Sequence, residues 1–157
     1  MKKLQEKKQR NNKGFSMVEL IIVIAIMAIL VGVVASQLVP YMEKARISKD
    51  KTTLDAVYTA FQSAIAENEV STDITATGIG ATGDAATTLY AVNSGVAGSL
   101  AKLLGANMDT DAELNGKFTS KEGTAGGGAG NIEFKYSAST GVITVSKGTS
   151  TVLKITN

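Results

Sequence analysis

The chain has 157 residues and a net charge of +2, and it contains neither cysteine nor histidine. This length is sufficient for one domain with a modest core. The missing residue types exclude disulfide bonds, thiol nucleophiles, zinc sites of the usual kind and histidine-based acid–base catalysis. We therefore expect the C-terminal part of the chain to be held together by packing alone.

The basic charge is concentrated at the N-terminus. Residues 1–14 contain six basic residues and one acidic residue, a net charge of +5, and the remaining residues carry −3. Nucleic-acid binding usually requires a basic surface that extends over a whole domain. This distribution therefore argues against a nucleic acid as the specific partner.

An apolar run follows the basic segment. Residues 20–35 contain no charged side chain, and Glu19 is the single charged residue within 15–39. At about 1.5 Å per residue, some 20 helical residues cross the ~30 Å hydrocarbon core of a bilayer. The basic segment should stay in the cytoplasm, with the rest of the chain outside. Two ordinary interpretations are a single-pass anchor and a secretory signal that is cut after Val33-Val34-Ala35.

The residues that lead into this run form an unusual combination. They read Lys13-Gly14-Phe15-Ser16-Met17-Val18-Glu19-Leu20. This sequence closely resembles the type IV prepilin signature: a basic leader that ends in Gly, then Phe, then Glu as the fifth residue after the cut. A carboxylate in a membrane segment costs about 2.5–3.5 kcal/mol at the bilayer centre and less near the interface. A generic signal peptide gains nothing from it, so the pattern favours the type IV pilin family, with a resemblance over about residues 1–65.

The resemblance implies a processing site and an assembly residue. A membrane-embedded prepilin peptidase would cut the bond between Gly14 and Phe15, and the new N-terminal Phe15 would be N-methylated. The carboxylate of Glu19 would pair with the α-amine of Phe15 on a neighbouring subunit. It would thereby set the assembly register, because an unpaired buried charge costs about 3–5 kcal/mol. The alternative is that Glu19 only stabilises the helix start through the helix dipole.

One long helix is expected from Phe15 to Glu67. Pro40, the single proline, should kink this helix or mark a turn, and the stretch from Gly32 to Pro40 is a candidate for unwinding on assembly. Residues 41–67 carry an apolar stripe at helical spacing, made of Leu54, Val57, Tyr58, Phe61 and Ile65. Charged residues are assigned to the polar positions of this half: Glu43, Lys44, Arg46, Lys49, Asp50, Lys51 and Asp55.

The C-terminal part predicts a small antiparallel sheet. Three short runs alternate in hydrophobicity, 132–136, 142–146 and 151–156, and turn residues lie between them. Residues 96–104 predict a short helix ended by Gly105. Residues 71–99 show no clear period and are interpreted as a long loop or linker with room for one short strand.

The predicted fold class is therefore α+β. It is a pilin fold, in which the C-terminal half of a long N-terminal helix packs on a sheet of about three strands. We divide the chain into a cleaved basic leader, residues 1–14, a transmembrane and polymerisation helix, residues 15–40, and a globular head, residues 41–157. Many pilins close the C-terminal region with a disulfide, which this chain cannot form.

Other candidate sites are weaker. The alternating acids Asp109, Asp111 and Glu113 offer carboxylates to calcium but lack a full calcium-loop pattern. The run Gly126-Gly127-Gly128 lacks the Lys-Ser/Thr that a phosphate loop needs, which favours a turn. No nucleophile–base pair is found, so neither enzymatic activity nor a cofactor is expected.

These features predict a structural subunit of a type IV pilus that serves in adhesion, motility or aggregation. Its partners would be further copies of the chain, the prepilin peptidase and the pilus assembly machinery. It would be a single-pass protein of the cell membrane before assembly and part of a cell-surface pilus afterwards. Two alternatives are a pseudopilin of a type II secretion or DNA-uptake system, and a secreted binding domain with an ordinary signal, starting at Ser36.

Overall fold

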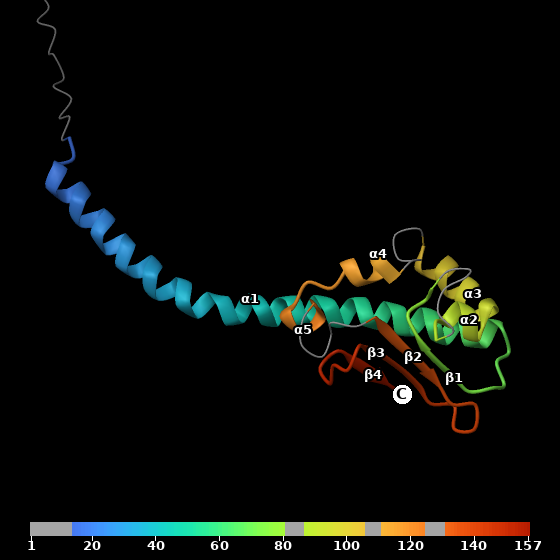
Figure 1. Cartoon of the computed structure of the whole chain (residues 1–157). Coiled ribbons are helices and arrows are strands. Elements are labelled where there is room, and N and C mark those ends of the chain that lie inside the picture. The colour runs from blue at the N-terminus through green and yellow to red at the C-terminus, as the bar shows by residue number, and fades with distance from the viewer. Residues whose placement is uncertain (1–13, 81–86, 106–110, 125–130) are drawn as a thin grey trace, which may run out of the picture. The chain divides into compact units, whose positions relative to one another are not determined.

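The computed structural model describes residues 14–80, 87–105, 111–124 and 131–157 (Figure 1). The chain divides into two compact units, Met1–Val39 and Pro40–Asn157. Helix α1, Met17–Glu67, contributes its first part to the N-terminal unit and its second part to the C-terminal unit. We call the C-terminal unit the head.

Helix α1 is close to the predicted helix but begins two residues later, at Met17. It includes Pro40 without interruption, so the predicted turn at this proline is wrong. Within the N-terminal unit every described side chain is exposed, including the whole apolar run from Leu20 to Val39. These residues make no core of their own, because the described part of this unit is one helix with no second element on which to bury them.

The head contains a four-stranded antiparallel sheet in the order β1-β2-β3-β4. Its strands are β1 (Ile74–Thr77), β2 (Ile132–Tyr136), β3 (Ile143–Lys147) and β4 (Lys154–Thr156). The three strands predicted from alternation are confirmed, although β4 is shorter than the predicted run. The additional strand, β1, lies in the segment that we interpreted mainly as a loop. It pairs along its whole length with β2, which follows it by more than fifty residues, so its partner is not indicated by local sequence.

The inner face of the sheet packs on the C-terminal half of α1 (Figure 1). Strand register brings Ala76, Phe134 and Val145 side by side, and all three are buried. The ring of Phe134 lies 5.0 Å from that of Phe61 on α1, centroid to centroid, with the planes tilted by 56°. This ring contact joins the helix to the sheet. Burial of one side chain such as Phe contributes about 1.5–3 kcal/mol to the free energy of unfolding. The α+β prediction is confirmed.

The apolar stripe of α1 is confirmed as the core face of the helix. Leu54, Val57, Phe61 and Ile65 are buried, and Tyr58 is partly buried against the same cluster. Their spacing of three or four residues places them on one side of the helix, and the sheet covers that side.

Four short helices complete the described part of the head: α2 (Leu89–Val92), α3 (Ser94–Leu104), α4 (Asp111–Gly116) and α5 (Lys121–Thr124). Helix α3 confirms the prediction for residues 96–104 and its end at Gly105, which has a positive φ of 77°. It begins two residues earlier than predicted because Asn93 caps it: Oδ1 of Asn93 accepts a hydrogen bond from the Val96 amide at 3.1 Å.

Candidate functional site

The start of α1 is held by a reciprocal pair of side chains. The amide N–H of Ser16 donates to Oε2 of Glu19 at 2.9 Å, and the amide of Val18 donates to Oγ of Ser16 at 3.3 Å. The carbonyl of Ser16 accepts the first helical hydrogen bond, from the Leu20 amide at 3.2 Å. This arrangement is a capping box, in which an N-cap Ser and a Glu three residues later satisfy amides that the first turn leaves free. The Ser-x-x-Glu spacing of Ser16 and Glu19 is the sequence pattern of a capping box. Our sequence analysis did not identify Ser16 as the N-cap.

The bond between Gly14 and Phe15 lies just before this cap, outside the helix. The side chain of Phe15 is 90% exposed, and a Cβ added to Gly14 would meet no atom within 4 Å. No neighbouring part of the described chain therefore covers this bond. Lys13 and the rest of the predicted leader lie outside the described residues.

The apolar run after Glu19 is long enough to cross a membrane. Among the described residues, α1 is the one helix whose length and composition meet that requirement, and its apolar part is fully exposed. A signal sequence near an N-terminus meets the same test. Because soluble proteins rarely leave so large a continuous apolar surface in water, residues 20–39 require cover from lipid or from other protein.

A second polar site lies inside the head, around Asp50 of α1. The Asp50 side chain is fully buried. Its carboxylate accepts hydrogen bonds from the amides of Thr119 and Ser120, at 3.0 Å and 2.9 Å, and from the Ser120 hydroxyl at 2.5 Å. Backbone and hydroxyl donors thus replace the water that a buried carboxylate loses.

Our assignment of Asp50 to a polar, solvent-facing position is wrong. Asp50 lies four residues before Leu54, so the helical period places it on the buried stripe rather than opposite it. Glu43, one heptad earlier, lies on the same side and is half-buried. The spacing alone therefore predicted that Asp50 faces the core. It could not predict the donors to its carboxylate, because they come from a segment about seventy residues away in the sequence.

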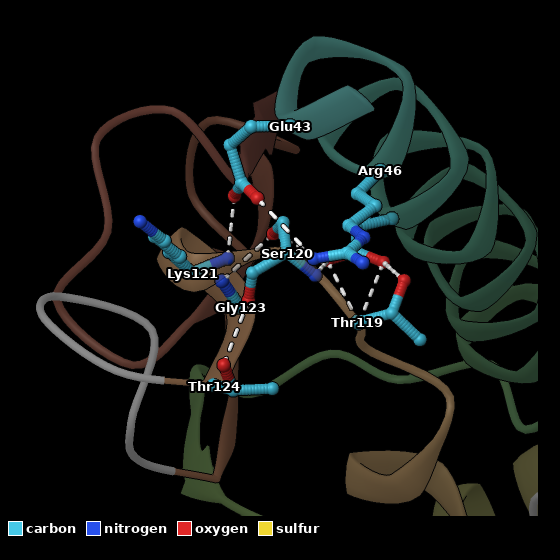
Figure 2. Close-up of polar contacts among 8 residues, drawn as sticks. Glu43, Arg46, Thr119, Ser120, Lys121, Gly123 and Thr124 are labelled. Atoms are coloured by element: carbon cyan, nitrogen blue, oxygen red, sulfur yellow. Dashed lines mark hydrogen bonds and ion pairs between the residues drawn. The ribbon is translucent and has the colours of Figure 1, made fainter. Parts of the chain in front are cut away.

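The segment 118–124, which includes α5, is docked to two parts of the head, α1 (Figure 2) and the β3–β4 turn. Besides the Asp50 contacts, Oε1 of Glu43 accepts from the Lys121 amide at 2.5 Å, and Glu43 also forms an ion pair with Arg46 at 3.8 Å. On the other side, the Ser150 hydroxyl donates to Oε1 of Glu122 at 2.7 Å. The expectation that packing alone holds this region is therefore wrong: buried and half-buried carboxylates connect α1, segment 118–124 and the β3–β4 turn.

Gly123 allows this segment to lie directly on the carboxylate. A Cβ at position 123 would be 2.6 Å from Oδ2 of Asp50 and 2.9 Å from Cβ of Phe118. Both distances are shorter than real Cβ contacts, so a larger residue would push the segment away from α1.

Lys147 is the second buried charge near Asp50. It is the last residue of β3 and follows Ile143 and Val145 on the inner face, so its side chain enters the core and is 2% exposed. Burial lowers the pKa of Lys147, and the carboxylate of Asp50 acts in the opposite direction. Its Nζ lies 5.4 Å from the centre of the Phe118 ring, within the range of a cation–π contact. We had placed Lys147 in a turn, because the predicted strand ended one residue too early.

The described residues do not assemble the calcium candidates. Oδ1 of Asp111 accepts a hydrogen bond from the Ile79 amide at 2.6 Å, so this carboxylate helps hold the segment after β1. Across the described ranges, no three acidic side chains come close enough to share a metal ion. Asp109 and the Gly126–Gly128 run lie outside the described residues.

The outer face of α1 in the head carries small side chains along two shallow grooves, which include Thr59 and Ser63. Both hydroxyls donate to carbonyls one helical turn earlier, Thr59 to Asp55 at 2.9 Å and Ser63 to Thr59 at 3.0 Å. In the second groove, Thr52 and Thr53 donate in the same way to the carbonyls of Ser48 and Lys49, at 3.1 Å and 3.3 Å. None of these four hydroxyls therefore bonds to a base that could activate it as a nucleophile.

Removal of the Asp50 carboxylate should destabilise the head strongly. Asp50→Ala leaves the amides of Thr119 and Ser120 without their acceptor and Lys147 without its nearby negative charge, which should cost about 3–5 kcal/mol of unfolding free energy. Asp55→Ala, an exposed change on the same helix, should stay within about 0.5 kcal/mol. Urea denaturation of the detergent-solubilised chains measures both values, and equal losses would contradict the role assigned to Asp50.

Lys147 should make stability depend on pH. Its pKa in the folded chain lies below the ordinary 10.5, so the unfolded chain binds more protons between these two values. The contribution of Lys147 to the unfolding free energy should therefore increase as the pH rises through the folded pKa toward 10.5. Lys147→Met should remove this increase, whereas Lys154→Met, an exposed change on β4, should retain it. Denaturation series from neutral pH to 10.5 provide the measurement, and parallel curves for the parent and Lys147→Met would refute it.

Comparison with known proteins points to one family. Residues 9–35 match the prokaryotic N-terminal methylation motif, which spans the Gly14–Phe15 bond, the cap and most of the apolar run. The type IV major pilin protein PilA of Myxococcus xanthus (strain DK1622) is 36% identical over 58 residues. The matched region covers 37% of this chain and 26% of that pilin. No solved structure matches the chain.

The motif match, the pilin relative and a long apolar helix followed by a small antiparallel sheet agree with the resemblance found in the sequence. The N-terminal part of the chain is therefore similar to type IV pilins.

Proposed function

We propose that this chain is a structural subunit of a type IV pilus, cut between Gly14 and Phe15, N-methylated at Phe15 and polymerised through α1. Before assembly it is a single-pass protein of the cell membrane, with the basic leader in the cytoplasm and the head outside. The observation that carries the proposal is the exposed apolar run of α1, which begins directly after one carboxylate, Glu19.

The apolar run is suited both to the membrane before assembly and to the core of a filament afterwards. In the membrane, lipid covers residues 20–39, and in a filament the same residues pack among copies of α1. Lipid tails are as apolar as these side chains, so moving the run from lipid to a filament core changes hydrophobic burial little. The hydrophobic effect keeps the run out of water in both states but does not select how far each subunit advances along the filament.

Glu19 selects the axial position of each subunit in the filament. In the unassembled chain its carboxylate is held by the Ser16 amide at 2.9 Å, next to the future N-terminal residue. In a filament the carboxylate pairs with the α-ammonium of Phe15 on a neighbouring subunit. A subunit shifted out of register leaves both charges unpaired in an apolar core, at a cost of about 3–5 kcal/mol.

The head forms the outer part of the filament in this proposal. A filament that serves in adhesion, motility or aggregation requires heads that stay folded at the cell surface without disulfides. Asp50 and Glu43 of α1 accept hydrogen bonds from segment 118–124, and Glu122 of that segment accepts one from Ser150. These contacts support that requirement, because they join distant segments of the head.

The mature N-terminus tests the processing step. Protein sheared from the cell surface should begin at Phe15 and be heavier by one methyl group than the unmodified mature chain, as measured by N-terminal sequencing and mass spectrometry. A start at Ser36 would identify an ordinary secreted domain and end the proposal. A methylated start at Phe15 in cells that make no long filaments at native expression would instead assign the chain to the pseudopilins.

Charge at position 19 should control assembly. Glu19→Gln and Glu19→Ala should both reduce filament yield at least tenfold, because neither side chain neutralises the buried ammonium of Phe15. Glu67→Gln, which changes an exposed carboxylate at the other end of α1, is the matched control and should assemble normally. Quantitative electron microscopy and immunoblots of sheared fractions measure the yield, and full assembly of both Glu19 variants would disprove the register role.

A further inference from the structure

We propose that the Ser16–Glu19 cap is a positioning device for leader removal: it stops α1 at Ser16 and so keeps the Gly14–Phe15 bond in a non-helical segment that a peptidase can bind. Ser16 is then a positioning residue for processing. This inference rests on the proposed function, because it presupposes a cut between Gly14 and Phe15.

Three hydrogen bonds determine where the helix starts. Glu19 Oε2 accepts from the Ser16 amide, Ser16 Oγ accepts from the Val18 amide, and the Ser16 carbonyl accepts from the Leu20 amide. The first two use side chains as acceptors for amides that no preceding turn satisfies. A residue that caps in this way stands outside the helix, so the peptide bond between residues 14 and 15 stays two positions before the first helical residue, Met17.

The position of this boundary matters for a protease. A peptidase commonly binds its substrate as an extended strand, through the backbone N–H and C=O groups around the scissile bond. Inside a helix those groups are committed to partners one turn away. The helix start therefore decides whether the bond is available, and the exposure of Phe15 and the open space around Gly14 agree with an available bond.

The sequence before the bond contains other residue types that can start a helix. Asn11 and Asn12 are also good N-cap residue types. Without the cap at Ser16, a helix that begins at either residue would include the scissile bond in its first turns. Gly14 disfavours such an extension because of its poor helix propensity, and the Ser16–Glu19 pair opposes it a second time.

The match to the N-terminal methylation motif covers the same segment. Residues 9–35 contain the two asparagines, the proposed scissile bond and both capping residues. In the proposed function, methylation at Phe15 requires that the leader is removed first, so the motif and the cap concern the same bond.

The experiment measures leader removal from full-length precursor in detergent by a prepilin peptidase, with mass spectrometry as the readout. Ser16→Ala should be cut more slowly, by up to about fivefold, the equilibrium factor that corresponds to the loss of one N-cap, and Ser16→Thr, which can cap, should restore the rate to within about twofold of the parent. Ser36→Ala is the matched control: this serine lies on the same helix, but its hydroxyl donates to the Val33 carbonyl and caps nothing. It should be cut at the parent rate.

A second pair separates capping from charge. Glu19→Gln keeps an oxygen that accepts from the Ser16 amide, as in capping boxes generally, so it should be cut faster than Glu19→Ala although both lose the charge. If the parent is cut at Gly14–Phe15 but Ser16→Ala is cut at the same rate, the cap has no positioning role and only this inference fails. If Ser16→Thr is as slow as Ser16→Ala, the inference also fails. If the parent is not cut at that bond, the proposed function itself fails.

Discussion

The head depends on one buried carboxylate. Asp50 projects from the same side of α1 as the apolar stripe, and it binds the amides of Thr119 and Ser120, which lie 69 and 70 residues further along the chain. A buried carboxylate without donors would be strongly unfavourable, so the chain must bring the segment 118–124 onto α1 wherever Asp50 is buried. This requirement orders a part of the head that contains few large apolar side chains.

Lys147 shows how the same region balances charge and packing. The strand period turns this side chain inward, where it meets the Phe118 ring and the field of Asp50. A lysine there costs desolvation free energy, but the opposite charge nearby limits the cost. In a chain without cysteine, such polar contacts connect α1, segment 118–124 and the sheet.

At the other end of the chain, Glu19 has a different pair of roles. In the single chain it completes the cap of α1, and in the proposed filament it neutralises the N-terminus of a neighbour. The two roles are compatible, because an ionised carboxylate accepts hydrogen bonds at both of its oxygens. Oε2 of Glu19 can keep the Ser16 amide while the other oxygen pairs with the ammonium of Phe15 on the neighbour.

The sequence by itself determined the elements and their buried faces. The apolar run, the stripe from Leu54 to Ile65, helix α3 and strands β2 to β4 all follow from local periodicity, because the period of a helix or strand decides which side chains share a face. The Gly14–Phe15–Glu19 pattern likewise needs no structure to be seen. Even the inward direction of Asp50 and Lys147 follows from this periodicity, although we assigned Asp50 to a polar position of the helix and ended the predicted strand one residue before Lys147.

Only the tertiary structure decided which distant groups meet. Strand β1 contains four residues with a weak pattern, and it exists as a strand because β2 pairs with it. Two of the four donors to Asp50 are backbone amides, and an amide has no signature in the sequence. Periodicity predicts which way a side chain points. A hydrogen bond to a remote backbone group depends in addition on the path of the chain between the two residues, and the whole fold sets that path.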